Sequence, residues 1–362
     1  MKFHICSSTV VLLMTMACAR LASVAPNASL TVSPIIAAEN LKLAAAHSAA
    51  NDGISMLVMV NGQIVFEDYP NRGGVDRPHE LASGTKSFSC ALAVAASADG
   101  LLTLDERVAD TITEWRADPR KSKMTIRQLL SLTGGQETGD ERGNVPTYAQ
   151  AIQATATFEP GEKFQYGAVP FQVFGEVMRR KLESRKQSPL DYLKARVFEP
   201  IGLRVARWRH GADGNPHLPS GAFLTAREWA KYGELIRLGG TWEGKQILSA
   251  STLDECFRGT PQNPAYGLTW WLARDVSADL RATIRQLAFG TDLARSITGI
   301  PRDLVFAAGA GQQRLYVSRS ANLVVVRQAT GILESLAGTR RSGFSDAEFL
   351  SLLLTGQSVK SK

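Results

Sequence analysis

The alternation of apolar and polar residues predicts β-strands near both ends of the chain. Near the start, residues 55–60 and 63–67 are rich in β-forming residues and flank Asn61-Gly62. This dipeptide is typical of a two-residue type I′ turn, so the segment predicts a hairpin. A second, smaller hairpin is predicted at 242–248. Toward the end of the chain, β-branched and aromatic residues recur in three short segments, at 303–308, 314–317 and 323–328.

Between these segments the apolar residues recur at helical spacing, and stop signals such as Asp99-Gly100 and Gly239-Gly240 follow some of them. Pro170 suits the first turn of one helix, because proline lacks the N–H that a first turn leaves unpaired. Helices are predicted at residues 39–50, 83–98, 101–115, 125–132, 170–183, 189–198, 226–238 and 346–354.

Strands at both ends and helices in the middle favour an α+β fold. We expect one antiparallel sheet built from both chain ends and flanked by helices, with the central residues inserted as a mostly helical domain. The α/β part is expected at about residues 38–80 and 265–355, and the helical part at about residues 81–264. A chain of 362 residues, 44% of them hydrophobic, can bury a substantial core in this arrangement.

The net charge of +7 is not gathered into a dense run of lysines and arginines. A nucleic-acid-binding domain would concentrate its positive charge on one face, so the sequence argues against such a partner.

The first residues resemble an export signal. A short basic start, an apolar core too short to span a bilayer and an Ala-x-Ala-like end predict a signal peptide at residues 1–19, with cleavage as late as Ala25 as an alternative. Its removal leaves residues 20–362 as a single unit. Cys18 permits a lipoprotein interpretation, but Thr15 stands where leucine is usual. Because no later apolar run is long enough to span a membrane, we expect a periplasmic or secreted protein.

Cys90 and Cys256 are the cysteines that remain after removal of the signal. They could form one disulfide. Each lies in a helical pattern, however, which favours two small, buried hydrophobic side chains.

Ser83 and Lys86 form the only Ser-x-x-Lys pattern in the chain. On a helix, residues three apart lie on one face, so the amine can reach the hydroxyl. At the start of a helix, unpaired N–H groups and the helix dipole stabilise negative charge. These features favour a serine nucleophile with an amine as its base partner, and an oxyanion held at the same place.

Further segments of the chain resemble the serine β-lactamase and penicillin-binding-protein superfamily, on its class C side. That side also holds family VIII carboxylesterases and hydrolases of 6-aminohexanoate oligomers. The resemblance extends over roughly residues 40–355 and rests on the segments 81–88, 99–105, 125–135, 164–167, 199–203, 266–271 and 313–317. It implies the fold of that superfamily, the chemistry of a serine hydrolase that forms an acyl-enzyme, and no cofactor.

The resemblance assigns roles residue by residue. Ser83 matches the nucleophile, Lys86 its base partner, and Tyr166 the tyrosine of a Tyr-x-Asn motif that relays protons to the leaving group. Which of Lys86 and Tyr166 is the general base stays open, because such groups titrate as a unit. Gly309 would let substrate approach a core strand, and the N–H of Ala310 would join that of Ser83 in an oxyanion hole. The alternative for 309–311 is a glycine-rich connection between strands.

Two departures from the family pattern bear on the substrate. The usual Lys-Thr-Gly or His-Thr-Gly is replaced by alanines before Gly309, and Ala168 stands where the motif has asparagine. The missing groups bind the carboxylate and the side-chain amide of a β-lactam. We therefore expect esters or linear amides as substrates rather than strong penicillinase activity. Gln172, about one turn into the next helix, is predicted to supply a replacement amide.

Three aromatic residues are candidates for the acyl pocket. Trp270 and Trp271 could form its wall, with Tyr148 contributed by a loop. Because successive strand residues point to opposite faces, at most one of the two tryptophans faces the site. Packing in the core is the alternative for either.

Other hydrolytic motifs are absent. The sequence has neither a Gly-x-Ser-x-Gly elbow nor a His-Glu-x-x-His motif. Its histidines after the signal lack zinc-ligand spacing; they are His47, His79, His210 and His217. We expect an exported serine hydrolase acting on a small-molecule ester or amide. The alternatives are a β-lactamase or D,D-peptidase, and a non-catalytic module that binds acyl or peptidoglycan-like ligands.

Overall fold

A computed structural model describes residues 1–2, 36–139, 145–283, 293, 299–339 and 343–359 of the chain. The predicted signal peptide at 1–19 therefore lies almost wholly outside the described residues, and both of its possible cleavage sites lie outside them. No helix in the described ranges combines the length and the apolar character needed to cross a membrane.

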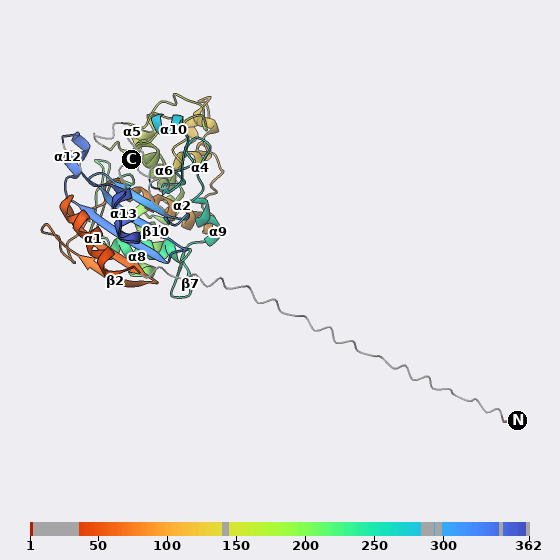
Figure 1. Ribbon diagram of the computed structural model, residues 1–362. Coiled ribbons are helices and arrows are strands. Elements are labelled where there is room, and N and C mark those ends of the chain that lie inside the picture. Colours follow the sequence, from red (N-terminus) through yellow and green to blue (C-terminus); the bar gives the residue numbers. More distant parts are fainter. Residues whose placement is uncertain (3–35, 140–144, 284–292, 294–298, 340–342, 360–362) are drawn as a thin grey trace. The chain divides into compact units, whose positions relative to one another are not determined.

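Strands from both chain ends form one antiparallel sheet, as predicted (Figure 1). Among the described residues this sheet has six strands, in the order β2-β1-β11-β10-β9-β8. Asn61 and Gly62, between β1 and β2, both have positive φ, which confirms the predicted hairpin turn. The strands are β1 (Gly53–Val60), β2 (Gln63–Asp68), β8 (Trp271–Leu272), β9 (Val305–Gly309), β10 (Gln313–Ser318) and β11 (Leu323–Ala329).

Helices cover both faces of this sheet. On one face lie α1 (Ala38–Ala50) and α13 (Asp346–Thr355), and Arg314 of β10 reaches Asp346 there. On the other face lies α8 (Ala226–Arg237), where a Cβ on Gly233 would come within 2.8 Å of Leu315. Arg314 and Leu315 are successive residues of one strand, so their side chains point to opposite faces. The sheet is thus the middle layer of the α/β part.

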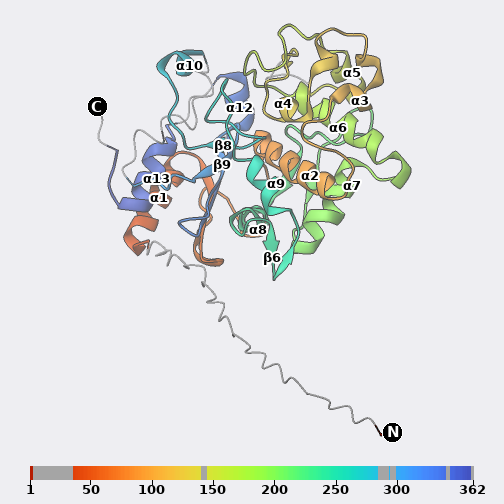
Figure 2. The ribbon, with the colours of Figure 1, turned by 90° about the vertical axis from the view of Figure 1, so that its right-hand side faces the viewer.

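The central residues are mostly helical, as expected, and α2 packs beside α7 and α9 (Figure 2). Two small β structures interrupt the helices. One is a short sheet with β5 between β3 and β4, and the other is the hairpin of β6 and β7 that was predicted at 242–248. The boundaries predicted between the α/β and helical parts stay a prediction. The elements are β3 (His79–Glu80), α2 (Ser87–Ala98), α3 (Val108–Thr111), α4 (Ile126–Leu130), α5 (Tyr148–Gln153), α6 (Val169–Lys181), α7 (Pro189–Leu193), β4 (Arg207–Trp208), β5 (Ala222–Leu224), β6 (Thr241–Trp242), β7 (Lys245–Gln246) and α9 (Ala250–Glu255). Two further helices, α10 (Ala278–Thr283) and α12 (Ile332–Ala337), lie later in the chain.

The helix predicted at 101–115 is wrong over most of its length. Only α3 and a 3₁₀ turn at Thr113–Trp115 are helical there. The backbone around Leu104 and Glu106 instead accepts hydrogen bonds from the N–H groups of Arg127 and Ile126. Pairing with a segment some twenty residues later therefore replaces the local helical bonds that the apolar spacing predicted.

The prediction of two unpaired cysteines is also wrong. Cys90 on α2 and Cys256, directly after α9, form a disulfide with a Cα–Cα distance of 6.2 Å. Both residues are fully buried, as the helical pattern predicted. Burial could be read from local spacing, but the pairing depends on the packing of α2 beside α9, which no local pattern shows.

Candidate active site

The Ser-x-x-Lys pattern lies in a 3₁₀ turn, Ala82–Lys86, that leads into α2. The α-helix itself begins at Ser87, so the α-helix predicted from position 83 is corrected to a 3₁₀ start. In a 3₁₀ helix, side chains three residues apart lie one above the other. Lys86 Nζ accordingly donates a hydrogen bond to Ser83 Oγ at 2.8 Å. Ala82, just before the serine, has a φ of +45°, a region that disfavours any residue with a Cβ.

Lys86 is buried, with 4% of its surface exposed. Its Nζ also donates to the carbonyl oxygen of Pro219 at 3.2 Å. The same atom lies 4.8 Å from the centre of the Tyr166 ring and 5.4 Å from that of Phe171. The hydroxyl, the amine and the tyrosine ring predicted to act together are therefore brought together.

Tyr166 is half-buried on the segment that leads into α6. Its ring stacks on Trp271 with centroids 5.9 Å apart and meets the ring of Tyr266 edge-on. A Cβ on the next residue, Gly167, would come within 2.4 Å of the carbonyl oxygen of Thr138, so the segment is held close to that backbone. That same oxygen accepts a hydrogen bond from the N–H of Ala168 at 3.0 Å.

The two tryptophans separate as expected. Trp271 contacts Tyr166, whereas Trp270 packs against Tyr232 and Phe257 in the core. Trp271 is thus the one that lies beside the candidate site. Both side chains are almost fully buried.

Gly309 ends β9 beside the Ser83 turn. A Cβ there would lie 2.1 Å from the carbonyl oxygen of Leu81 and 3.0 Å from the N atom of Gly84. Only glycine lets β9 come this close, so the absence of a side chain serves the contact between strand and turn. Ala310 follows immediately, at the first position of the turn to β10. Its predicted N–H donation to an oxyanion stays a prediction.

Two pocket residues lie elsewhere than expected. Gln172 is fully buried, and its amide bonds backbone groups at both ends: Nε2 donates to Pro146 O at 2.7 Å, and Oε1 accepts from Leu218 N at 3.2 Å. It therefore does not offer a replacement amide to substrate. Tyr148 begins α5 rather than lying on a loop, and its buried hydroxyl donates to Pro216 O at 3.0 Å. Burial raises the pKa of this phenol well above its usual value.

The sequence interpretation missed two buried polar side chains on β10, the strand that pairs with β9. Arg314 Nη1 donates to Gly309 O at 3.3 Å, and its guanidinium forms a bidentate pair with Asp346 at 2.6 and 3.0 Å. Gln313 Nε2 donates to the carbonyls of Ala310 and Gly311 at 3.3 and 3.1 Å. Burial, the largest single effect, lowers the pKa of Arg314, but the charge and hydrogen bond of Asp346 and the charges of nearby tyrosines together raise it above its usual value. The signal in the sequence was the polar pair Gln313-Arg314 at the start of the strand predicted at 314–317.

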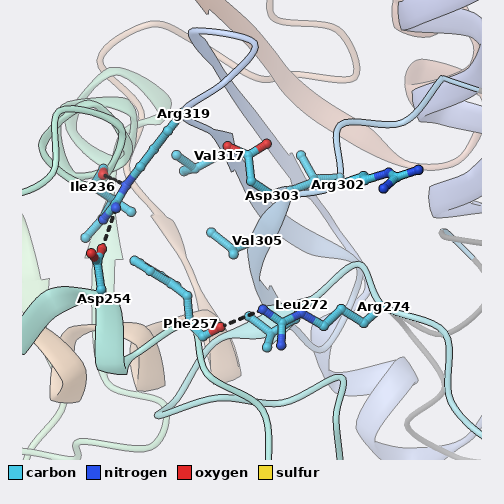
Figure 3. A pocket seen from close by; sticks show the side chains of 11 residues that line it. Ile236, Asp254, Phe257, Leu272, Arg274, Arg302, Asp303, Val305, Val317 and Arg319 are labelled. Atoms are coloured by element: carbon cyan, nitrogen blue, oxygen red, sulfur yellow. Dashed lines mark hydrogen bonds and ion pairs between the residues drawn. The ribbon is translucent and has the colours of Figure 1, made fainter. Parts of the chain in front are cut away.

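A cavity of about 190 Å³ lies at the other end of β9 (Figure 3). Val305, the first residue of β9, lines it, whereas Gly309 at the end of the strand contacts the Ser83 turn. None of the predicted catalytic residues lines this cavity. Its walls are formed by Ile236, Asp254, Phe257, Leu272, Arg274, Arg302, Asp303, Leu304, Val305, Val317 and Arg319. In the part of the chain that the structure describes, no cluster of histidine, cysteine and acidic side chains could hold a metal ion.

Comparison with known proteins gives a consistent result. The chain is similar in structure to a family VIII carboxylesterase, with a TM-score of 0.61, 20% sequence identity, and coverage of 88% of this chain and 97% of the other. It is similar to a D-stereospecific amidohydrolase from Streptomyces sp., with a TM-score of 0.63, 16% identity, and 89% and 99% coverage. It is also similar to a penicillin-binding protein homolog from Caulobacter crescentus, with a TM-score of 0.60, 15% identity, and 81% and 92% coverage.

At these identities the similarity shows the fold. No curated protein matches the sequence. The Beta-lactamase family, however, matches residues 42–332, which is most of the chain and includes Ser83, Lys86, Tyr166 and Gly309. The chain therefore belongs to the Beta-lactamase family.

Proposed function

We propose that this protein is an exported serine hydrolase that forms an acyl-enzyme on Ser83 and acts on small esters or linear amides. The observation that carries the proposal is the hydrogen bond of 2.8 Å from Lys86 Nζ to Ser83 Oγ, with the same amine 4.8 Å from the centre of the Tyr166 ring. A serine hydroxyl is a weak nucleophile unless a neighbouring base accepts its proton. In this proposal the buried amine and the neighbouring phenol accept that proton.

The reaction then has two halves. Ser83 Oγ bonds to the substrate carbonyl carbon while its proton passes to the Lys86–Tyr166 pair. The N–H groups of Ser83 and Ala310 hold the oxyanion that forms. Collapse breaks the bond to the alcohol or amine, which leaves with a proton from the pair. Water attacks the acyl-enzyme in the same way, releasing the acid and restoring the serine hydroxyl.

The substrate class follows from the groups that the site lacks. Alanines at 307 and 308 leave no cation or hydroxyl before Gly309 to meet a carboxylate, and Ala168 cannot bind an amide as asparagine would. Arg314 does not replace the missing cation, because it is fully buried and paired with Asp346. Esters and linear amides without a carboxylate near the scissile bond fit this site best. The names of the carboxylesterase and the amidohydrolase of similar fold agree with this class.

Two features support export. The first residues carry the signal-peptide pattern, and Cys90 and Cys256 form a disulfide. Disulfides persist in oxidising compartments such as the periplasm and the extracellular space. Detection of the processed protein outside the cytoplasm tests this part of the proposal.

Hydrolysis of p-nitrophenyl butyrate by the purified protein and by its Ser83→Ala variant tests the activity. We expect turnover by the wild type and its loss in the variant; equal rates would refute the proposal. A non-catalytic binding module would instead give stable labelling by a fluorescent penicillin, with no release and no turnover of the ester. Hydrolysis of nitrocefin at rates above those for the ester would favour a β-lactamase.

A further inference from the structure

We infer that Gln172 is a positioning residue for the proton-transfer machinery: it fixes the carbonyl of Pro219 that accepts a hydrogen bond from Lys86. This inference rests on the proposed function. Gln172 lies on α6 and has no exposed surface, so it acts through the backbone that it binds rather than through substrate.

The residues that lead into β5 are held one after another by side chains of other elements. The carbonyl of Pro216 accepts from Tyr148, and the next carbonyl, that of His217, accepts from Trp208 Nε1 at 2.8 Å. The N–H of Leu218 then donates to Gln172, and the carbonyl of Pro219 accepts from Lys86. The carbonyl that accepts from Lys86 therefore belongs to a segment whose backbone is held by side chains of other elements.

Within this segment Gln172 acts closest to Pro219. Proline fixes its own φ near −65°, and the residue before a proline is restricted to extended conformations. Few rotations therefore remain between the Leu218 N–H, which Gln172 binds, and the Pro219 carbonyl, which faces Lys86. A change in the direction of the first group is passed on to the second.

Gln172 also lies on the helix that follows Tyr166. The N–H of Gln172 donates to Ala168 O at 3.3 Å in the first turn of α6, two residues after Tyr166. Its Nε2 donates to Pro146 O just before α5. Gln172 thus joins the helix that follows the tyrosine to the segment that accepts the lysine.

The consequence concerns the direction of the Lys86 amine. Lys86 Nζ donates hydrogen bonds to Ser83 Oγ and to Pro219 O. If Pro219 O moves, the amine loses a hydrogen bond that aims it at the serine. Because Gln172 lies out of reach of substrate, we expect slower turnover with little change in substrate binding.

The test compares Gln172→Met with Gln328→Met. Gln328 is 1% exposed, accepts from Ser55 Oγ at 3.0 Å and donates to Leu224 O at 3.0 Å, so it is a matched buried amide with no link to Lys86. For p-nitrophenyl butyrate we expect kcat of Gln172→Met to fall about tenfold or more, with KM within about twofold of the wild type. The control variant is expected to keep kcat within about twofold. Hydrogen exchange at the Leu218 amide should become faster in Gln172→Met only.

The outcomes separate this inference from the proposed function. A wild-type kcat in folded Gln172→Met, or an equal loss in both variants, would overturn the inference while the Ser83→Ala result stands. If Ser83→Ala keeps full activity, the proposed function fails, and the role of Gln172 in proton transfer fails with it. Should Gln172→Met not fold, Gln172→Glu keeps an oxygen that can accept from Leu218. Slow exchange at Leu218 with most of kcat retained supports the inference, and slow exchange with kcat lost overturns it.

Discussion

The contact between β9 and the Ser83 turn can be tested with a single methyl group at Gly309. In Gly309→Ala the added Cβ would lie 2.1 Å from the carbonyl oxygen of Leu81, whereas ordinary contacts begin at 3.4 Å. The strand and the turn must therefore separate by about 1.3 Å, since both clashing partners are backbone groups that no rotamer change can move aside. We expect the free energy of unfolding to fall by about 1–3 kcal/mol, the usual cost of overpacking.

The effect on turnover should exceed the effect on stability. A shift of this size moves the N–H of Ala310 away from the N–H of Ser83, and loss of one oxyanion donor typically lowers kcat by roughly 10²–10³. Turnover of p-nitrophenyl butyrate and thermal unfolding measure the two effects separately. Labelling of Ser83 by a fluorophosphonate reports whether the nucleophile itself remains reactive.

Gly74→Ala is the matched control. A Cβ at that position would meet only the Cβ of Arg77 at 3.5 Å, an ordinary contact, and its φ is not in the left-handed region. It should keep both stability and kcat. A folded Gly309→Ala with wild-type kcat would refute the reasoning, because it would show that the approach of β9 to the turn is not needed for turnover.

Three further predictions concern other parts of the structure. Lys86→Met should lower kcat by roughly 10²–10⁴ without unfolding the protein, measured on the same ester, because it removes the buried amine beside Ser83. Reduction of the disulfide, or the Cys90→Ala/Cys256→Ala double variant, should lower the free energy of unfolding by about 2–5 kcal/mol, since the bond spans 166 residues; an unchanged denaturation midpoint would contradict this. The hydrogen bond and charge of Arg180 lower the pKa of Glu114 from 4.5 to about 2, so the stability from this pair is full above pH 4.5 and lost as pH falls toward 2. Glu114→Gln should therefore show a flatter dependence of melting temperature on pH in that window.

The sequence predicted correctly those elements that are determined by residues close together in the chain. The turn at Asn61-Gly62 requires two residues that tolerate positive φ, and the apolar stripe of 226–238 suffices to place α8. The helix predicted at 101–115 failed because its backbone pairs with 124–127, a segment that lies apart in sequence. The partner of Cys90 could not be found for the same reason, since it depends on how α2 packs beside α9.

For the candidate site, the sequence predicted the reactive side chains but not the side chains that hold them in position. The contact between Ser83 and Lys86 could be predicted from their spacing, because three residues make one turn of a 3₁₀ helix. Gln172 and Gln313 have no such spacing to read. The amide of Gln172 binds the backbone of Leu218, and that of Gln313 binds the backbone of Ala329 on β11 as well as the adjacent turn. From sequence alone, a glutamine near a site is readily interpreted as a substrate contact, as was predicted for Gln172.

Burial is what changes that interpretation. A buried amide must satisfy both of its ends within the protein, because an unpaired buried polar group costs about 1–3 kcal/mol. Gln172 does so on the segment that receives Lys86, and Gln313 on the turn that contains Ala310. In the proposed mechanism each of these glutamines holds a backbone group of the site without contacting the reacting atoms itself. Substitutions at these two glutamines should therefore lower kcat by more than the loss of folding stability alone would explain. Substrate affinity should change least.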